Sequence, residues 1–170
     1  MGKRSNFKRK KRDFYSTPIE AVEPLIKHLS QDFTFAEPCA GNGALCRHLE
    51  YYGGNCLWAS DIEPQHEGII KKDFTEVQNI KSEYVITNPP WDRNILHPLI
   101  DFFRVKKPTW LLFDADWMHT KQAIPFMVSC KKIISIGRVK WFGNTTGKDN
   151  CVWGLFDNNL FAETVFVGRS

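Results

Sequence analysis

Residues 87–91, with the sequence TNPPW, are the part of this chain best suited to chemistry. They follow the apolar run YVI, which is typical of a buried strand. Neither Pro89 nor Pro90 has an N–H group to donate to a neighbouring strand, so the strand has to stop at Asn88. The turn then presents a carboxamide, a proline carbonyl and the Trp91 indole at the sheet edge. These groups can hold a planar group with an exocyclic amine, although the pattern alone also fits a strand that ends in a rigid turn.

A second group of candidate residues lies in the segment EPCAGNG, which begins at Glu37. Gly41 and Gly43 permit positive φ and a close approach of the backbone to a ligand. Asp61 follows Gly43 by 18 residues, near the interval at which an acidic side chain meets ribose hydroxyls. Cys46 stands where a pyrophosphate-binding loop has its third glycine. This substitution and the acidic Glu37 disfavour a phosphate ligand and suit a sulfonium cofactor with a cationic amino-acid tail.

Apolar periodicity predicts the elements that must position these residues. Thr17 and Pro18 are suited to be the cap and first residue of the first helix. Alternating strands and helices with ligand-type residues at the strand ends predict a doubly wound α/β fold, with a mostly parallel, seven-stranded, Rossmann-like sheet. The last two strands are separated by a polar loop too short for a helix, which predicts a C-terminal antiparallel hairpin. The expected helices are 19–29, 43–52, 95–103 and 120–128, and the expected strands are 33–36, 56–59, 68–70, 84–87, 110–113, 133–136 and 151–156.

The N-terminus carries a concentrated positive charge. Residues 1–17 contain seven basic side chains against Asp13 alone, a net charge of +6, whereas the whole chain carries +4. We therefore expect a flexible basic tail over residues 1–13 and a single domain over residues 14–170. Such a tail suits a nucleic-acid backbone, where counterion release drives binding, but a solubility tail or a nuclear-import signal has the same composition. The charges nearest the domain are Lys8, Arg9, Lys10, Lys11 and Arg12.

The remaining composition excludes several classes of protein. No apolar run approaches the roughly 20 residues of a membrane span, so no membrane contact is expected. The five cysteines are odd in number and form no C-x-x-C pair, which indicates reduced thiols and a cytoplasmic protein. The five histidines form no zinc-binding pair, so no metal site is expected.

Five segments between residues 14 and 157 resemble, in order and spacing, the motifs of S-adenosylmethionine-dependent N6-adenine methyltransferases. The order of these motifs resembles the gamma arrangement of that family. The small size resembles phage-type members, which would imply a prokaryotic or phage-infected host cell. Larger gamma members carry a target-recognition domain after the catalytic core, whereas only 79 residues follow Trp91 here. Sequence specificity is therefore in doubt, and a separate specificity partner is one expectation. The five segments are 14–18, 37–45, 60–62, 72–74 and 88–91.

The resemblance implies S-adenosylmethionine as the cofactor and assigns residues to it. Asp61 and Ile62 would bind the ribose, Asp73 and Phe74 the adenine, and the segment at 15–17 would close over the methionine end. The full cofactor set is Tyr15, Thr17, Glu37, Pro38, Ala40, Gly41, Gly43, Asp61, Ile62, Asp73, Phe74 and Asn88.

The resemblance also implies the chemistry of the TNPPW segment. Asn88 and the Pro89 carbonyl would accept the two hydrogens of an adenine amine, which exposes the nitrogen lone pair to the methyl donor. Pro90 would fix the turn, and Trp91 would stack on a base flipped out of the duplex. Trp141 or Phe142 would form the opposite wall, and Arg93 would lie near a phosphate, as would the basic tail.

Three classes of function remain after this comparison. Methylation of adenine in DNA is favoured. The second class is the same transfer to adenine in RNA or to a protein glutamine, although tyrosine is usual at position 91 in glutamine enzymes and the tryptophan here favours a nucleobase. The third is a module that binds cofactor and nucleic acid without methyl transfer. A monomer or a weak dimer is expected.

Overall fold

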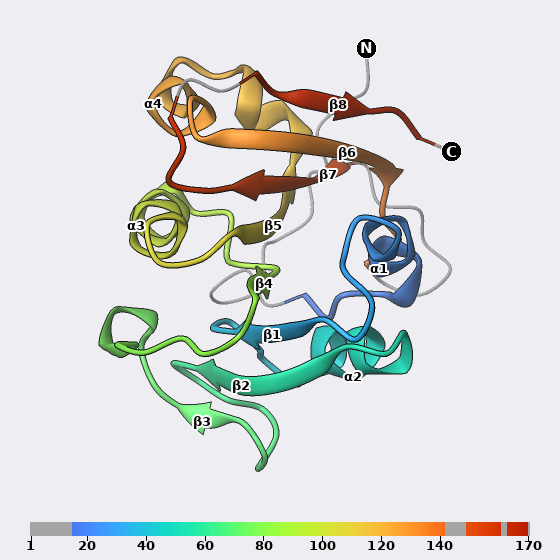
Figure 1. Ribbon diagram of the computed structural model, residues 1–170, viewed down its shortest axis with the longest axis vertical. Helices are drawn as coiled ribbons and strands as arrows, with labels where there is room; N and C mark the ends of the chain where they lie inside the picture. The colour runs from blue at the N-terminus through green and yellow to red at the C-terminus, as the bar shows by residue number, and fades with distance from the viewer. Residues whose placement is uncertain (1–14, 142–148, 161–162, 170) are drawn as a thin grey trace.

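The sheet in the computed structural model of this chain has eight strands, in the order β3-β2-β1-β4-β5-β7-β6-β8 (Figure 1). The structure describes residues 15–141, 149–160 and 163–169. The predicted basic tail therefore lies outside the described residues. The strands are β1 (Thr34–Glu37), β2 (Asn55–Asp61), β3 (Ile70–Lys71), β4 (Tyr84–Thr87), β5 (Thr109–Asp114), β6 (Cys130–Arg138), β7 (Asn150–Phe156) and β8 (Val165–Val167).

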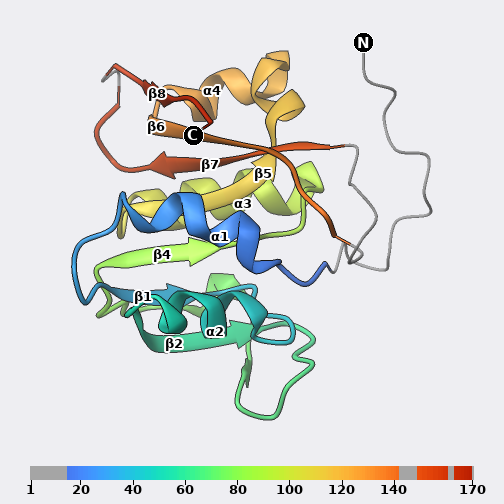
Figure 2. The ribbon, with the colours of Figure 1, turned by 90° about the vertical axis from the view of Figure 1, so that its right-hand side faces the viewer.

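The strand directions confirm the predicted fold class. Strands β3, β2, β1, β4 and β5 are mutually parallel, and β7 runs antiparallel to both β5 and β6. The carboxyl ends of β1, β2 and β4 consequently meet at one edge of the sheet, on the right in Figure 2. Ligands bind at this edge in doubly wound folds, so the fold brings the predicted site segments together.

Helices cover both faces of the sheet. Helices α1 (Ile19–Ile26) and α2 (Ala44–Tyr51) lie on one face, and α3 (Arg93–Arg104) lies on the other (Figures 1 and 2). Strand β5 shows why two cores form: Trp110 and Leu112 pack with the α1 side, and Leu111 and Phe113 pack with the α3 side. Alternate side chains of a strand point to opposite faces, so a strand buried on both faces is apolar throughout.

Three predictions about these elements were wrong. The helix expected at 120–128 is replaced by a 3₁₀ turn and a short helix, because Pro125 has no N–H and fits only the first turn of a helix. Thr17 does not cap α1: Pro18 occupies the cap position without a side-chain bond. An eighth strand, β8, pairs in parallel with β6 and was not predicted, because three residues are too few to show a period. The replacing elements are η4 (Lys121–Ala123) and α4 (Ile124–Met127). Two further 3₁₀ turns are η3 (Ala115–His119), which precedes them, and η2 (Phe74–Glu76), which follows β3.

None of the helices in the described part of the chain combines the length and the apolar character that a membrane-spanning helix needs.

Candidate active site

Two cavities lie side by side at the carboxyl edge of the sheet, and Asn88 and Tyr15 line both of them. The small cavity has a volume of about 310 Å³ and lies between the loop at 37–45 and the end of β2. The large cavity has a volume of about 1010 Å³ and lies between the end of β4, α3 and the segment after β5. Asn88 therefore lies at the boundary between the two cavities.

The orientation of the Asn88 side chain is fixed by the segment before α1. Strand β4 ends at Thr87, and the Asn88 Nδ2 then donates to Thr17 Oγ1 at 3.0 Å and to the Tyr15 carbonyl at 3.5 Å. Because a carbonyl can only accept, the amide nitrogen has to be on this side. The amide oxygen, Oδ1, is the group that remains to accept a hydrogen bond from a ligand. Thr17 is only 4% exposed, which protects this contact from water.

Aromatic rings form the wall of the large cavity beside Asn88. Trp91 Nε1 donates to the Leu112 carbonyl at 3.1 Å, which holds the indole in place. The Trp141 ring meets Trp91 edge-on at a centroid distance of 5.7 Å, and the Tyr15 ring lies 6.0 Å from Trp141. These rings are partly exposed in the cavity, so a planar ligand has aromatic faces and edges to contact.

The loop at the small cavity is held by Asp61. Its Oδ2 accepts from the Gly41 N–H and its Oδ1 from the Glu63 N–H, both at 2.8 Å. Gly41 and Gly43 have φ of 53° and 77°, a backbone conformation that favours glycine. The carboxylate thus positions the loop, and the second lone pair of each oxygen can still accept from a ligand hydroxyl.

Glu37 is an acidic side chain buried in the wall of the small cavity. It is 1% exposed, and its Oε1 accepts from the Cys39 N–H at 2.9 Å. Burial raises the pKa of this carboxyl to about 8. Burial disfavours the charged form of this carboxyl, and a cation bound beside it would favour that form.

Asp73 and Phe74 form the far wall of the small cavity. Asp73 Oδ1 accepts from the Thr75 N–H at 2.9 Å and from the Thr75 hydroxyl at 2.7 Å, which starts the 3₁₀ turn η2. The Phe74 ring packs edge-on against Phe102 at 5.7 Å. Both side chains are therefore held by neighbours in the fold while they line the cavity.

The structure brings most of the predicted site residues to these two cavities. Gly41 and Gly43 shape the loop without lining the small cavity, whereas ten other predicted cofactor residues line it: Tyr15, Thr17, Glu37, Pro38, Ala40, Asp61, Ile62, Asp73, Phe74 and Asn88. Pro90 also lines the small cavity, and Pro89, Trp91, Arg93 and Trp141 line the large one. Phe142 and the basic residues Lys8, Arg9, Lys10, Lys11 and Arg12 lie outside the described residues.

Sequence reasoning missed most of the far wall of the large cavity. This wall comes from α3 and from the segment between β5 and β6. The sequence contained a pattern that could have located only one of its residues, His97. His97 lies one turn after Arg93 on the helix that follows TNPPW, so it had to lie near the site. The main missed residues are His97, Asp114, Trp117, Gln122 and Phe126. Within the described ranges no cluster of His, Cys, Asp and Glu side chains is suited to a metal ion.

Comparison with solved structures identifies the fold. A candidate RNA methyltransferase from Pyrococcus horikoshii matches with a TM-score of 0.63 at 14% identity, over 91% of this chain and 92% of that one. A methyltransferase subunit of a type I restriction-modification system from Streptococcus thermophilus matches with a TM-score of 0.60 at 10% identity, over 91% and 47%. A dimethyladenosine transferase from Plasmodium falciparum matches with a TM-score of 0.57 at 14% identity, over 84% and 63%.

The chain has the fold of S-adenosylmethionine-dependent methyltransferases. No protein-family model and no curated protein sequence matches it. The matching structures also include an O-methyltransferase and a precorrin methyltransferase, so the fold does not select the acceptor. The acceptor has to be argued from the site.

Proposed function

We propose that this protein is an S-adenosylmethionine-dependent methyltransferase that acts on the exocyclic amine of adenine, in DNA. One observation carries the proposal: the Asn88 amide lies where the two cavities meet, with its nitrogen bound by the protein and its oxygen left to accept. An acceptor-only group at this junction can hold an amine by a hydrogen bond while the amine nitrogen attacks a methyl group, and the one proton that the methylated nitrogen then releases passes to water.

The residues of the small cavity fit the cofactor. Asp61 suits the ribose hydroxyls, Phe74 offers an apolar face and edge for the adenine, and Glu37 is a buried acidic group suited to the cationic methionine end. A cavity of about 310 Å³ also lies in the range that holds a ligand of this size. When bound, the cofactor supplies an electrophilic methyl group, and every other contribution to the reaction comes from the chain.

Asn88 Oδ1 and the Pro89 carbonyl are the proposed acceptors for the two hydrogens of the amine. An adenine amine is a weak nucleophile because its lone pair is delocalised into the ring. Two acceptors favour a pyramidal nitrogen, expose the lone pair and stabilise the positive charge that develops on it. Thr17 is the proposed positioning residue, since its hydroxyl oxygen keeps the amide nitrogen turned away from the amine.

The aromatic wall of the large cavity favours a nucleobase as acceptor. Trp91 and Trp141 present ring surface next to Asn88, and base–aromatic stacking is tolerant of base identity. A base in a duplex has to leave the stack to reach this position. The names of two matching structures, a restriction-modification methyltransferase subunit and a dimethyladenosine transferase, support adenine in nucleic acid as the acceptor.

The acceptor class is tested by incubating the protein with S-adenosylmethionine labelled in the methyl group, in the presence of duplex DNA, single-stranded DNA, RNA and a protein extract. The expected result is label in DNA, recovered as N6-methyldeoxyadenosine, and no label with Asn88→Ala. Label recovered only from RNA would show that the acceptor is RNA rather than DNA. Label only in protein would contradict a nucleobase as the acceptor. Cofactor binding without label in any acceptor would favour a binding module without methyl transfer.

A further inference from the structure

The large cavity has about 1010 Å³, more than three times the roughly 310 Å³ of the small cavity. One flipped adenine is smaller than the cofactor, which contains an adenine together with a ribose and a methionine. A single base beside Trp91 therefore leaves much of the large cavity for another part of the substrate. The residues that line this remaining volume indicate what that part is.

A second set of aromatic rings lines the large cavity on the side of α3 and α4, and we call His97, Trp117 and Phe126 the aromatic platform. The centroids of the His97 and Phe126 rings lie 4.3 Å apart with the rings tilted by 31°, and the centroid of the Trp117 ring lies 5.7 Å from that of His97. His97 and Phe126 are only partly buried and both line the cavity. Rings packed in an ordinary core would be covered, whereas these have surface left for a ligand.

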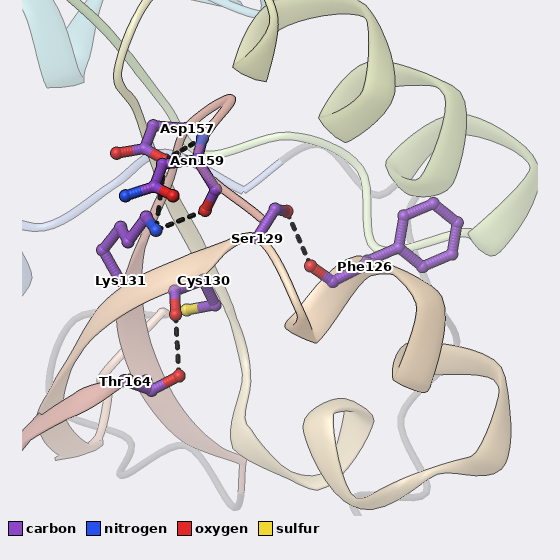
Figure 3. Close-up of polar contacts among 7 residues, drawn as sticks. All are labelled: Phe126, Ser129, Cys130, Lys131, Asp157, Asn159 and Thr164. Atoms are coloured by element: carbon purple, nitrogen blue, oxygen red, sulfur yellow. Dashed lines mark hydrogen bonds and ion pairs between the residues drawn. The ribbon is translucent and has the colours of Figure 1, made fainter. Parts of the chain in front are cut away.

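The platform is held rigidly before any ligand binds. Trp117 Nε1 donates to His97 Nε2 at 3.1 Å, which leaves the other nitrogen of a neutral imidazole to carry the proton. Burial and the nearby Arg93 lower the pKa of His97, in agreement with a neutral ring. The Phe126 carbonyl accepts from both the N–H and the hydroxyl of Ser129, and Figure 3 shows the Phe126 ring projecting away from that network on the side of α3.

We propose that the aromatic platform stacks on the nucleobase next to the target adenine in the same strand. The inference rests on the proposed function, because it requires a nucleic-acid substrate. Arg93 lies one helical turn before His97 and donates to Gln122 Oε1, so its guanidinium is held near the platform, where a backbone phosphate of that nucleotide would lie. The chain thus binds a short single-stranded segment of two bases, one at Asn88 and one at Phe126.

The test combines changes in the protein with changes in the substrate. Phe126→Leu keeps apolar bulk but loses the ring, and Phe126→Ala removes both. Ile124→Ala is the matched control, because Ile124 lies on the same short helix, is 63% exposed and lines neither cavity. Each protein is assayed for kcat/KM on an oligonucleotide with one target adenine, and on versions with an abasic nucleotide on the 5′ or the 3′ side of it.

We expect the wild-type protein to lose between about 5-fold and about 150-fold in kcat/KM when the base on one side is removed, the range set by base–aromatic stacking. On the intact oligonucleotide, the kcat/KM of the two Phe126 variants should be lower than that of the wild-type protein by a similar factor. Removal of the neighbouring base should then reduce the kcat/KM of these variants little further. Ile124→Ala should behave as wild type on every substrate. If the Phe126 variants lose the same factor in kcat/KM relative to wild type on the intact oligonucleotide and on both abasic versions, Phe126 has a packing role and the inference is overturned. Wild-type activity that ignores abasic sites on both sides would also overturn it. No label in nucleic acid from the wild-type protein would instead refute the proposed function.

Discussion

The two cavities are built in different ways. In the small cavity, Glu37, Asp61 and Asp73 are acidic side chains that each accept a hydrogen bond from a backbone N–H. In the large cavity aromatic rings line the wall together with polar side chains that include Asp92, Asp114 and Asp149. Trp91 and Trp117 are each held by a hydrogen bond from the indole N–H. The first arrangement suits the polar and charged groups of a cofactor, and the ring surface in the second suits the flat face of a nucleobase.

Asn88 belongs to both cavities, and its replacement should produce the largest effect. Asn88→Ala should reduce kcat by about 100-fold to 1000-fold, the usual cost of removing one group that stabilises transition-state charge. Cofactor affinity should change little, because the small cavity keeps its other contacts. Rapid-quench kinetics with labelled cofactor measures the first quantity, and calorimetry with S-adenosylhomocysteine measures the second. Unchanged turnover would remove Asn88 from the mechanism.

Changes confined to the small cavity should weaken cofactor binding rather than catalysis. In Asp61→Asn one oxygen is replaced by an NH₂ group, which faces a backbone N–H that donates to the carboxylate at 2.8 Å. We expect the Kd for S-adenosylhomocysteine to rise about 20-fold, because a hydrogen bond to a charged group is lost and a donor is left unpaired. Asp101→Asn is the control, since Asp101 forms an exposed ion pair with Arg104. A reduced kcat of Asp61→Asn at saturating cofactor would show that the small cavity contributes to catalysis as well as to cofactor binding.

The raised pKa of Glu37 predicts a pH dependence of cofactor binding. With a pKa of about 8, roughly one molecule in a hundred has the charged carboxylate at pH 6 and one in ten at pH 7. The α-amino group of S-adenosylhomocysteine stays mostly protonated over this range. If this cationic end requires the charged carboxylate, the Kd for S-adenosylhomocysteine should fall about tenfold from pH 6 to pH 7. Glu37→Gln should abolish this dependence. An identical pH profile in both proteins would exclude Glu37 as the counter-ion.

The same pKa has a consequence for the stability of the cofactor-free protein. The folded-state pKa of about 8 lies above the ordinary value of 4.5, so the folded protein binds the proton more tightly than the unfolded chain. The contribution of Glu37 to stability is therefore complete below pH 4.5 and is lost as the pH rises through 8. Urea denaturation at several pH values should show this decline in the wild-type protein and a flatter profile in Glu37→Gln.

Thr17 links the two cavities through Asn88, and its replacement should reduce kcat less than the replacement of Asn88 does. Thr17→Val keeps the shape of the side chain but removes the oxygen that accepts from Asn88 Nδ2 at 3.0 Å. We expect kcat to fall about tenfold, the cost of one hydrogen bond that selects the orientation of the amide. Thr17→Ser should restore most of kcat, while the Kd for S-adenosylhomocysteine stays near that of wild type. A normal kcat in Thr17→Val would show that the amide orients itself without this contact.

The small cavity and the elements around it were largely predictable from the sequence. Strand β4 was predicted with its observed bounds. Asp61 was found because it ends a strand, and Gly41 and Gly43 because they form a glycine turn. The resemblance to methyltransferase motifs supplied Tyr15, Thr17, Asp73 and Phe74. Helix α3 starts two residues earlier than expected, because Asp92 caps it by accepting from the Asn94 N–H. These features depend on residues close together in the chain.

The features that sequence reasoning missed depend on contacts between distant segments. Trp117 and His97 are 20 residues apart, and Asn88 and Thr17 are 71 residues apart, so only the fold brings either pair together. The segment after β5 consists of short 3₁₀ turns, which have no apolar period from which a helix face could be recognised. The aromatic platform therefore became visible only once the sheet order was known.

The most direct test of the central claim is the structure of the protein with S-adenosylhomocysteine and an oligonucleotide that contains the target adenine. The account predicts S-adenosylhomocysteine in the small cavity, the target adenine in the large cavity, and its amine nitrogen within about 2.6–3.2 Å of Asn88 Oδ1. An adenine bound elsewhere, or an Asn88 amide whose nitrogen faces the base, would contradict the account.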